Sequence, residues 1–174
     1  NKETMCKCNK YRDDKLHHEC GVLGIYGVDD AAGLAYYGLH ALQHRGQQGC
    51  GIVTVGPTGE FHRVKGDGLV NEVFNEQKIT KLPGRMAIGH VRYSNAGCKG
   101  TENIQPFLFH HNSGDFAMAN NGQIVNYSQL REELEDKGSL FQSSSDAEVL
   151  AHLIKKQGVD RDLPRIHALK DALN

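Results

Sequence analysis

The alternation of apolar and polar residues divides the chain into a polar N-terminal segment and an ordered remainder. Residues 1–19 carry charges throughout and too few apolar side chains to form a core. Order begins with the short apolar run Cys20–Val28, whose several glycines and flanking acidic residues predict a buried strand. The apolar residues that follow recur at helical spacing and predict a helix over 30–43, capped by an aspartate at its start.

The middle of the chain reads mainly as short strands. Residues 51–55 and 60–65 flank the turn sequence Gly56-Pro57-Thr58-Gly59, which predicts a β-hairpin. A short helical piece is expected near 70–74. The remaining apolar runs predict strands at 86–93, 106–109, 115–120 and 123–127. Between the last two of these lies Asn121-Gly122, a pair typical of a type I′ hairpin turn.

The C-terminal third changes to helical spacing. A helix is expected over 128–137 with Gly138 as its end, and another after Ser145, which forms a capping-box pattern with Glu148. A final helix is expected over 162–173. Strands in hairpins followed by helices predict an α+β fold, in which helices cover antiparallel sheets.

Composition excludes several classes of function. The chain of 174 residues has 20 Lys plus Arg against 21 Asp plus Glu, so it has no excess positive charge to neutralise phosphates, and we expect no nucleic-acid partner. No stretch approaches the roughly 18 to 20 consecutive apolar residues of a bilayer helix, so we expect no membrane partner. The five cysteines have no regular spacing, and residues 1–19 lack the apolar core of a secretory signal, which favours the cytoplasm. We interpret residues 1–19 as a leader.

Cys20 is the first candidate for chemistry. A cysteine at a strand start is usually a small buried hydrophobe, so the structural interpretation stays open. The catalytic interpretation requires a base. Cleavage between Glu19 and Cys20 would free an α-amino group that titrates near neutral pH, at about 7.7 to 8.0, and can accept the thiol proton. The attached leader would then keep the nucleophile inactive.

Three further positions carry polar groups in unusual places. His90 and Arg92 project from the same face of the strand 86–93, either because this is an edge strand with a solvated face or because Arg92 grips a carboxylate. Asn121 and Gly122 are hairpin residues or donors of an oxyanion hole. Asp146 either complements a helix dipole or receives a substrate ammonium. A thiol, oxyanion donors, an arginine and an aspartate together fit acyl transfer from free glutamine.

Six motifs follow one another along the chain: Cys20-Gly21-Val22-Leu23-Gly24-Ile25, Leu42-Gln43-His44-Arg45-Gly46-Gln47, Gly89-His90-Val91-Arg92-Tyr93, Asn103-Ile104-Gln105-Pro106-Phe107, Asn121-Gly122 and Ser144-Ser145-Asp146. In this order they resemble the glutaminase domain of the amidophosphoribosyltransferase family, over residues from Cys20 to about Gly158. Any one of them alone is weak, whereas six in order form a specific signal.

The resemblance implies a four-layer αββα sandwich of the N-terminal-nucleophile hydrolase type, incomplete at its C-terminal end. It implies a leader over 1–19 and a partial glutaminase domain over 20–174. Cys20 would attack glutamine to give a γ-glutamyl thioester and ammonia, with Asn121 and Gly122 as the oxyanion hole. The residues that the resemblance assigns to glutamine binding are Arg92 for the α-carboxylate, Asp146 for the α-amino group, and Arg45, His90 and Asn95.

The resemblance also implies partners for a longer protein. Ammonia would pass to a phosphoribosyltransferase domain that is absent from these 174 residues. That domain would use phosphoribosylpyrophosphate and Mg²⁺ in the first committed step of purine synthesis. The full-length protein would be a homo-oligomer. We expect no cofactor in this chain, because Cys6, Cys8, Cys50 and Cys98 do not match the cysteines that hold an iron-sulfur cluster in some family members.

Three departures and two alternatives accompany this interpretation. Family members commonly carry threonine where this chain has Asn95, histidine where it has Asn120 and asparagine where it has Gln123, so full activity is an expectation. One alternative is a truncated, non-catalytic module that binds glutamine or a partner chain. The other is a metal-binding module formed by Cys6 and Cys8 with His40 and His44, two histidines at i and i+4 of one helix.

Overall fold

A computed structural model describes residues 20–43, 48–93, 101–110 and 114–160, together with residues 167 and 170. It divides into two compact units, Asn1–Asn121 and Gly122–Asn174, and each unit is described by itself. Among the described residues, no helix has the length and apolar character needed to cross a bilayer.

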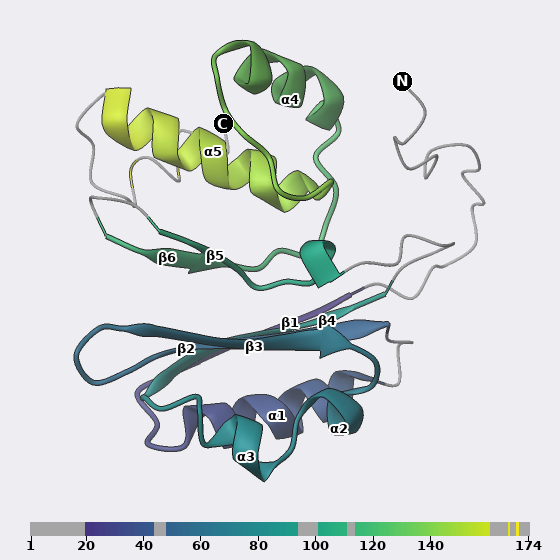
Figure 1. Cartoon of the computed structure of the whole chain (residues 1–174), viewed down its shortest axis with the longest axis vertical. Coiled ribbons are helices and arrows are strands. Elements are labelled where there is room, and N and C mark those ends of the chain that lie inside the picture. The colour runs from purple at the N-terminus through teal and green to yellow at the C-terminus, as the bar shows by residue number, and fades with distance from the viewer. Residues whose placement is uncertain are drawn as a thin grey trace. The chain divides into compact units, whose positions relative to one another are not determined.

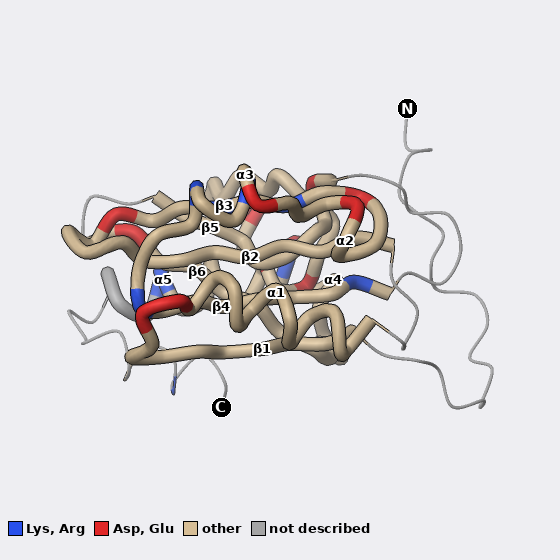
Figure 2. The backbone as a smooth tube through the Cα atoms, turned by 90° about the horizontal axis from the view of Figure 1, so that it is seen from below, with Lys and Arg blue, Asp and Glu red and all other residues tan. Residues whose placement is uncertain are grey.

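The first unit is built on a four-stranded antiparallel sheet. The strands β1 (Gly21–Tyr26), β2 (Gly49–Val55), β3 (Phe61–Asp67) and β4 (Met86–Arg92) are arranged in the order β1-β4-β2-β3. The strands β4 and β2 are therefore interior, with neighbours on both sides. Neither β1 nor β2 contains a charged residue, as the uninterrupted tan tubes of Figure 2 show.

Helices cover one face of this sheet (Figure 1). They are α1 (Ala31–Leu42), α2 (Val70–Val73) and α3 (Glu76–Ile79). The side chain of Asp30 caps α1 by accepting the Gly33 N–H at 3.0 Å. The helix can approach closely because β4 has a glycine below it: a Cβ at Gly89 would lie 3.0 Å from Leu39. The buried side chains of this core are Ala31, Ala32, Ala35, Leu39, Cys50, Ile52, Val70, Val73, Phe74, Leu82, Ala87 and Val91.

A second, two-stranded antiparallel sheet packs on the other face within the same unit (Figure 1). It consists of β5 (Phe107–Phe109) and β6 (Phe116–Met118), preceded by the 3-10 helix η2 (Thr101–Asn103). Ala117 of β6 lines a cavity of about 350 Å³ together with Val53 and Ile88 of the larger sheet. Helix, sheet and sheet are thus stacked as three layers within the first unit.

The second unit contains two helices in contact, α4 (Tyr127–Asp136) and α5 (Asp146–Asp160). Gly138, at a φ of 90°, ends α4. The N–H of Ser139 donates to the Leu134 carbonyl at 2.9 Å, which satisfies a free carbonyl of the last turn. Leu134 of α4 and Val149 of α5 are buried.

The predicted α+β class with antiparallel sheets is confirmed, as are the hairpin β2–β3, helix α1 and the end of α4 at Gly138. The predicted hairpin around Asn121-Gly122 is wrong. Residues 123–127 form no strand, because the Ile124 N–H donates to the Asp146 carboxylate at 2.9 Å and α4 already begins at Tyr127. The helix predicted over 162–173 lies almost entirely outside the described residues.

Candidate functional site

Cys20 lies directly before β1 and is half-buried. The register pairs Gly21 with Val91, so continuing it by one residue sets Cys20 opposite Arg92. The backbone after Arg92 holds the sulfur: the Tyr93 N–H donates to Sγ at 3.3 Å, and Sγ lies 3.7 Å from the Tyr93 carbonyl oxygen. The thiol therefore lies at the end of β4, on the face that carries His90 and Arg92.

His90 is at the interior of the sheet, between Val22 of β1 and Gly51 of β2. The edge-strand interpretation is therefore wrong, because β4 is paired on both sides. The imidazole is 1% exposed, and neither ring nitrogen has a hydrogen-bond partner among the described residues. Burial lowers the pKa of His90 to about 4, and the Arg92 charge acts in the same direction. At neutral pH the ring is uncharged.

Asn121, the last residue of the first unit, contacts the backbone of the nucleophile candidate. Its Nδ2 donates to the Cys20 carbonyl oxygen at 2.6 Å, although the two residues are 101 positions apart in the sequence. The preceding residue is also fixed, because the Asn120 N–H donates to Oε1 of Gln105 at 2.7 Å. An amide side chain is thereby held beside the residue that carries the thiol.

Gly122 and Asp146 belong to the second unit. Gly122 has a φ of 153°, a value that favours glycine over residues with a Cβ. Asp146 is the first residue of α5, and its carboxylate accepts the Ile124 N–H at 2.9 Å. The structure thus brings Cys20, His90, Arg92 and Asn121 together in one unit. Arg45 and Asn95 lie outside the described residues.

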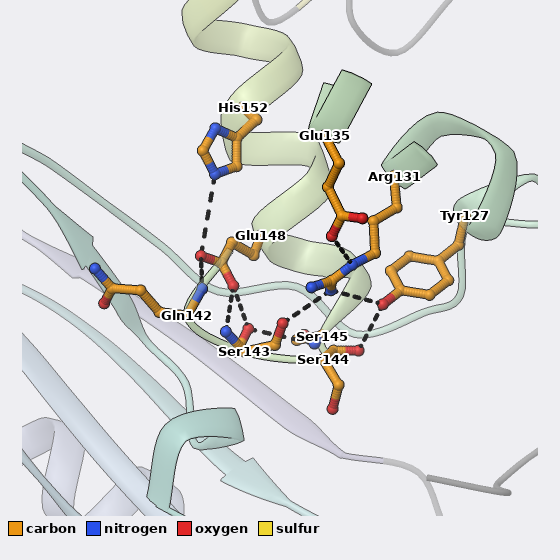
Figure 3. A network of polar contacts seen from close by, with 9 residues as sticks. All are labelled: Tyr127, Arg131, Glu135, Gln142, Ser143, Ser144, Ser145, Glu148 and His152. Atoms are coloured by element: carbon orange, nitrogen blue, oxygen red, sulfur yellow. Dashed lines mark hydrogen bonds and ion pairs between the residues drawn. The ribbon is translucent and has the colours of Figure 1, made fainter. Parts of the chain in front are cut away.

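A buried polar network in the second unit was missed by sequence reasoning (Figure 3). Glu148 is 4% exposed, and its carboxylate accepts the Gln142 N–H at 2.8 Å, the Ser143 N–H at 2.7 Å and the Ser143 hydroxyl at 2.6 Å. The predicted capping box is therefore wrong: the Ser145 hydroxyl accepts the Ala147 N–H at 3.3 Å, but the Glu148 carboxylate accepts from Gln142 and Ser143 and not from the Ser145 N–H. The apolar stripe of α5 gave no signal for this role.

Arg131 fixes the same segment from α4 (Figure 3). Its guanidinium donates to the Ser143 carbonyl at 2.9 Å, to the Tyr127 hydroxyl at 3.0 Å and to Glu135 at 2.8 Å. It also lies over the Phe141 ring, 4.3 Å from the centroid. The two helices thus hold the loop that leads into Asp146 through both its N–H and its carbonyl groups.

The metal-binding alternative rests on four residues, of which the structure describes one. Cys6, Cys8 and His44 lie outside the described residues, and His40 is exposed on α1. Within the described ranges, no three His, Cys, Asp or Glu side chains are grouped so as to hold a metal ion. Cys50 is 0% exposed in the helix-facing core, where it acts as a small hydrophobe.

Comparison with known proteins gives consistent matches. Residues 75–168 match the model of a family described as a glutamine amidotransferase domain. The chain is 54% identical over 146 residues to the chloroplastic amidophosphoribosyltransferase 1 of Arabidopsis thaliana, with 84% of this chain and 26% of the relative covered. It is 50% identical over 160 residues to an amidophosphoribosyltransferase of Lacticaseibacillus casei, with 91% of this chain and 80% of the relative covered.

A solved structure described as the allosteric regulatory enzyme of purine biosynthesis matches with a TM-score of 0.82 and 49% identity, over 87% of this chain and 32% of that one. This similarity confirms the predicted fold class. The chain spans about a quarter of the length of the Arabidopsis relative and about a third of the solved chain.

Proposed function

Because the chain belongs to the amidophosphoribosyltransferase family and corresponds to its N-terminal glutaminase portion, we propose that it hydrolyses the side-chain amide of L-glutamine. Cleavage between Glu19 and Cys20 exposes the α-amino group of Cys20, which takes the proton of the thiol. The sulfur attacks the amide carbon, the C–N bond breaks, and the nitrogen leaves as ammonia with that proton. Water then adds to the thioester, which releases glutamate and restores the thiol.

The observation that carries this proposal is the 2.6 Å hydrogen bond from Nδ2 of Asn121 to the Cys20 carbonyl oxygen. A carboxamide has two N–H donors, so one can hold the backbone of Cys20 while the other faces the oxygen of an attacked amide. The Gly122 N–H is the second oxyanion donor in this proposal. A backbone donor at a positive φ suits this task because glycine adopts the conformation without strain.

Charged groups hold the two ends of the substrate in this scheme. Arg92 binds the α-carboxylate with its planar fork of donors, from the strand position opposite Cys20. Asp146 binds the α-ammonium, assisted by the loop that Glu148 and Arg131 fix. His90 is uncharged and buried, and it lies on the same face of β4 as Arg92. Arg45 and Asn95 complete the proposed glutamine site.

In the longer protein, ammonia passes to phosphoribosylpyrophosphate in a Mg²⁺-dependent domain and supports purine synthesis. The link to purine synthesis rests on the names of the relatives and of the solved enzyme, and the roles of phosphoribosylpyrophosphate and Mg²⁺ rest on the family resemblance. A homo-oligomer and a cytoplasmic location belong to the same proposal, although the Arabidopsis relative is named chloroplastic.

The test measures mass and turnover on the same preparation. Intact mass should show the loss of residues 1–19, and the processed chain should release glutamate from glutamine. Cys20→Ala should retain the leader and form no glutamate. Cys50→Ala, which changes a buried cysteine of the core, is the matched control and should keep both activities. Glutamate formation by Cys20→Ala at the wild-type rate would refute the proposal. Glutamine binding without turnover in the wild type would favour the non-catalytic alternative.

A further inference from the structure

Gln105 occupies a position between the large sheet and the segment that carries Asn121. Its side chain is 7% exposed, and its Oε1 accepts the Asn120 N–H at 2.7 Å. The next residue, Asn121, donates to the Cys20 carbonyl at 2.6 Å. Two hydrogen bonds from consecutive residues thus connect Gln105 to the nucleophile candidate.

Gln105 is itself fixed against the sheet. Ile104 is fully buried, and its carbonyl accepts a hydrogen bond from Nζ of Lys65 in β3 at 3.1 Å. The backbone of 104–106 lies directly on β2: a Cβ at Gly51 would lie 2.5 Å from the Gln105 carbonyl oxygen and 3.1 Å from Cδ of Pro106. Only glycine leaves enough room for this contact, so the position of Gln105 is set by the rigid part of the unit.

The backbone that Gln105 holds lies outside the strand ladder. The pairing of β5 with β6 ends at Met118, so residues 119–121 have left the sheet when they reach Cys20. A side chain that must direct a hydrogen bond to within a few tenths of an ångström requires such support, because an orientation error of about 1 Å costs roughly 100-fold in rate. The carboxamide oxygen of Gln105 provides that support from the sheet.

We propose that Gln105 is a positioning residue for glutamine hydrolysis, which holds the Asn120 amide and thereby aims the Asn121 carboxamide at the oxygen of the attacked amide. This inference rests on the proposed function. Gln105 does not touch the substrate in this scheme. It acts through Asn121, whose interaction strengthens as negative charge develops, so its loss should lower kcat more than it raises KM.

The test compares Gln105→Met, which removes the acceptor at similar length, with Gln105→Glu, which keeps an acceptor oxygen. Gln77→Met, an exposed glutamine of α3, is the matched control. Direct loss of an oxyanion donor costs about 100-fold to 1,000-fold in kcat, so we expect Gln105→Met to lose about tenfold or more per processed chain. KM for glutamine should change less than about twofold in that variant. Gln105→Glu should recover most of the rate, and Gln77→Met should match the wild type.

Two measurements make the outcome independent of folding and of turnover. Alkylation of Cys20 by iodoacetamide should proceed equally in all variants, because it needs the thiol but no oxyanion donor. Hydrogen exchange of the Asn120 amide should accelerate in Gln105→Met and remain slow in Gln105→Glu. Unchanged kcat in Gln105→Met, or unchanged exchange at Asn120, would overturn the inference. Absence of glutamate formation in the processed wild type would instead refute the proposed function, and the exchange comparison would still test the contact.

Discussion

His90 makes the stability of the first unit dependent on pH. Burial lowers its pKa from 6.5 to about 4 in the folded chain. In the unfolded chain the imidazole returns to its ordinary value, so between these pH values the unfolded state binds more protons than the folded state. Stability therefore rises with pH in this window. The contribution of His90 is fully present above about pH 6.5 and is lost as the pH falls towards about 4.

The magnitude follows from the same two values. The difference between 6.5 and about 4, at roughly 1.36 kcal/mol for each pH unit, corresponds to about 3 kcal/mol. The 1% exposure of His90 means that little solvent screening reduces this figure. A loss of this size is a large fraction of the roughly 5 to 15 kcal/mol of a typical domain, so it should be visible in equilibrium unfolding.

The assay is urea unfolding followed by circular dichroism at pH 7.5 and at pH 4. We expect the wild type to lose about 3 kcal/mol more than His90→Gln between these two conditions. The exposed histidine of α1 provides the control, since His40→Gln should retain the wild-type dependence. Burial also lowers the pKa of His152, but that effect is common to all three proteins and cancels. Equal pH dependence in the wild type and His90→Gln would refute the reasoning.

Two further predictions concern packing and polar contacts. Glu148→Gln should lower the free energy of unfolding, measured by urea titration, by about 2 to 4 kcal/mol, because an amide cannot accept all three hydrogen bonds from Gln142 and Ser143. Glu132→Gln, on the exposed side of α4, is the control and should change the free energy of unfolding little. Gly51→Ala should lower the free energy of unfolding by about 1 to 3 kcal/mol, because the added methyl pushes residues 104–106 off β2. Gly24→Ala, with no atom within 4 Å of the added Cβ, should leave stability nearly unchanged; thermal unfolding compares the two variants. Equal effects within either pair would contradict the corresponding contact.

The regular elements could be predicted because their signals are local. The spacing of apolar residues gave α1, and the turn at 56–59 gave the β2–β3 hairpin to within two residues at each strand boundary. Strand order is not local. The polar side chains of His90 and Arg92 suggested an edge strand, but β1 returns to pair with β4 on one side while β2 pairs on the other. His90 is therefore buried inside the sheet, and burial lowers its pKa so that the ring is uncharged at neutral pH.

In the candidate site, too, the sequence revealed residues with local signals and missed those whose partners are distant in the sequence. Motifs identified Cys20 and Asn121, and the structure adds their contact. Gln105 and Glu148 lay inside recognised sequence patterns but carried no individual signal, because their partners depend on tertiary geometry. For Gln105 the partner is 15 positions away, across a two-stranded sheet. For Glu148 the local capping rule was overridden by the N–H groups of Gln142 and Ser143 in the preceding loop, which donate to its buried carboxylate.

Glycines of the large sheet allow the segments around the candidate site to pack directly against the core. The large sheet carries glycines on both faces, and those on β2 and β4 serve opposite neighbours: Gly89 admits Leu39 of α1, whereas Gly51 admits the backbone of 104–106. Each close approach fixes one layer against the same pair of interior strands, because the glycine adds no side chain of its own to the contact. The strand that carries His90 and Arg92 is thereby held from the helix side, and the segment that carries Gln105 from the other side. The distance between Asn121 and Cys20 is consequently determined by packing of the whole first unit, so a single added methyl at Gly51 should disturb the site more than a polar substitution on its surface.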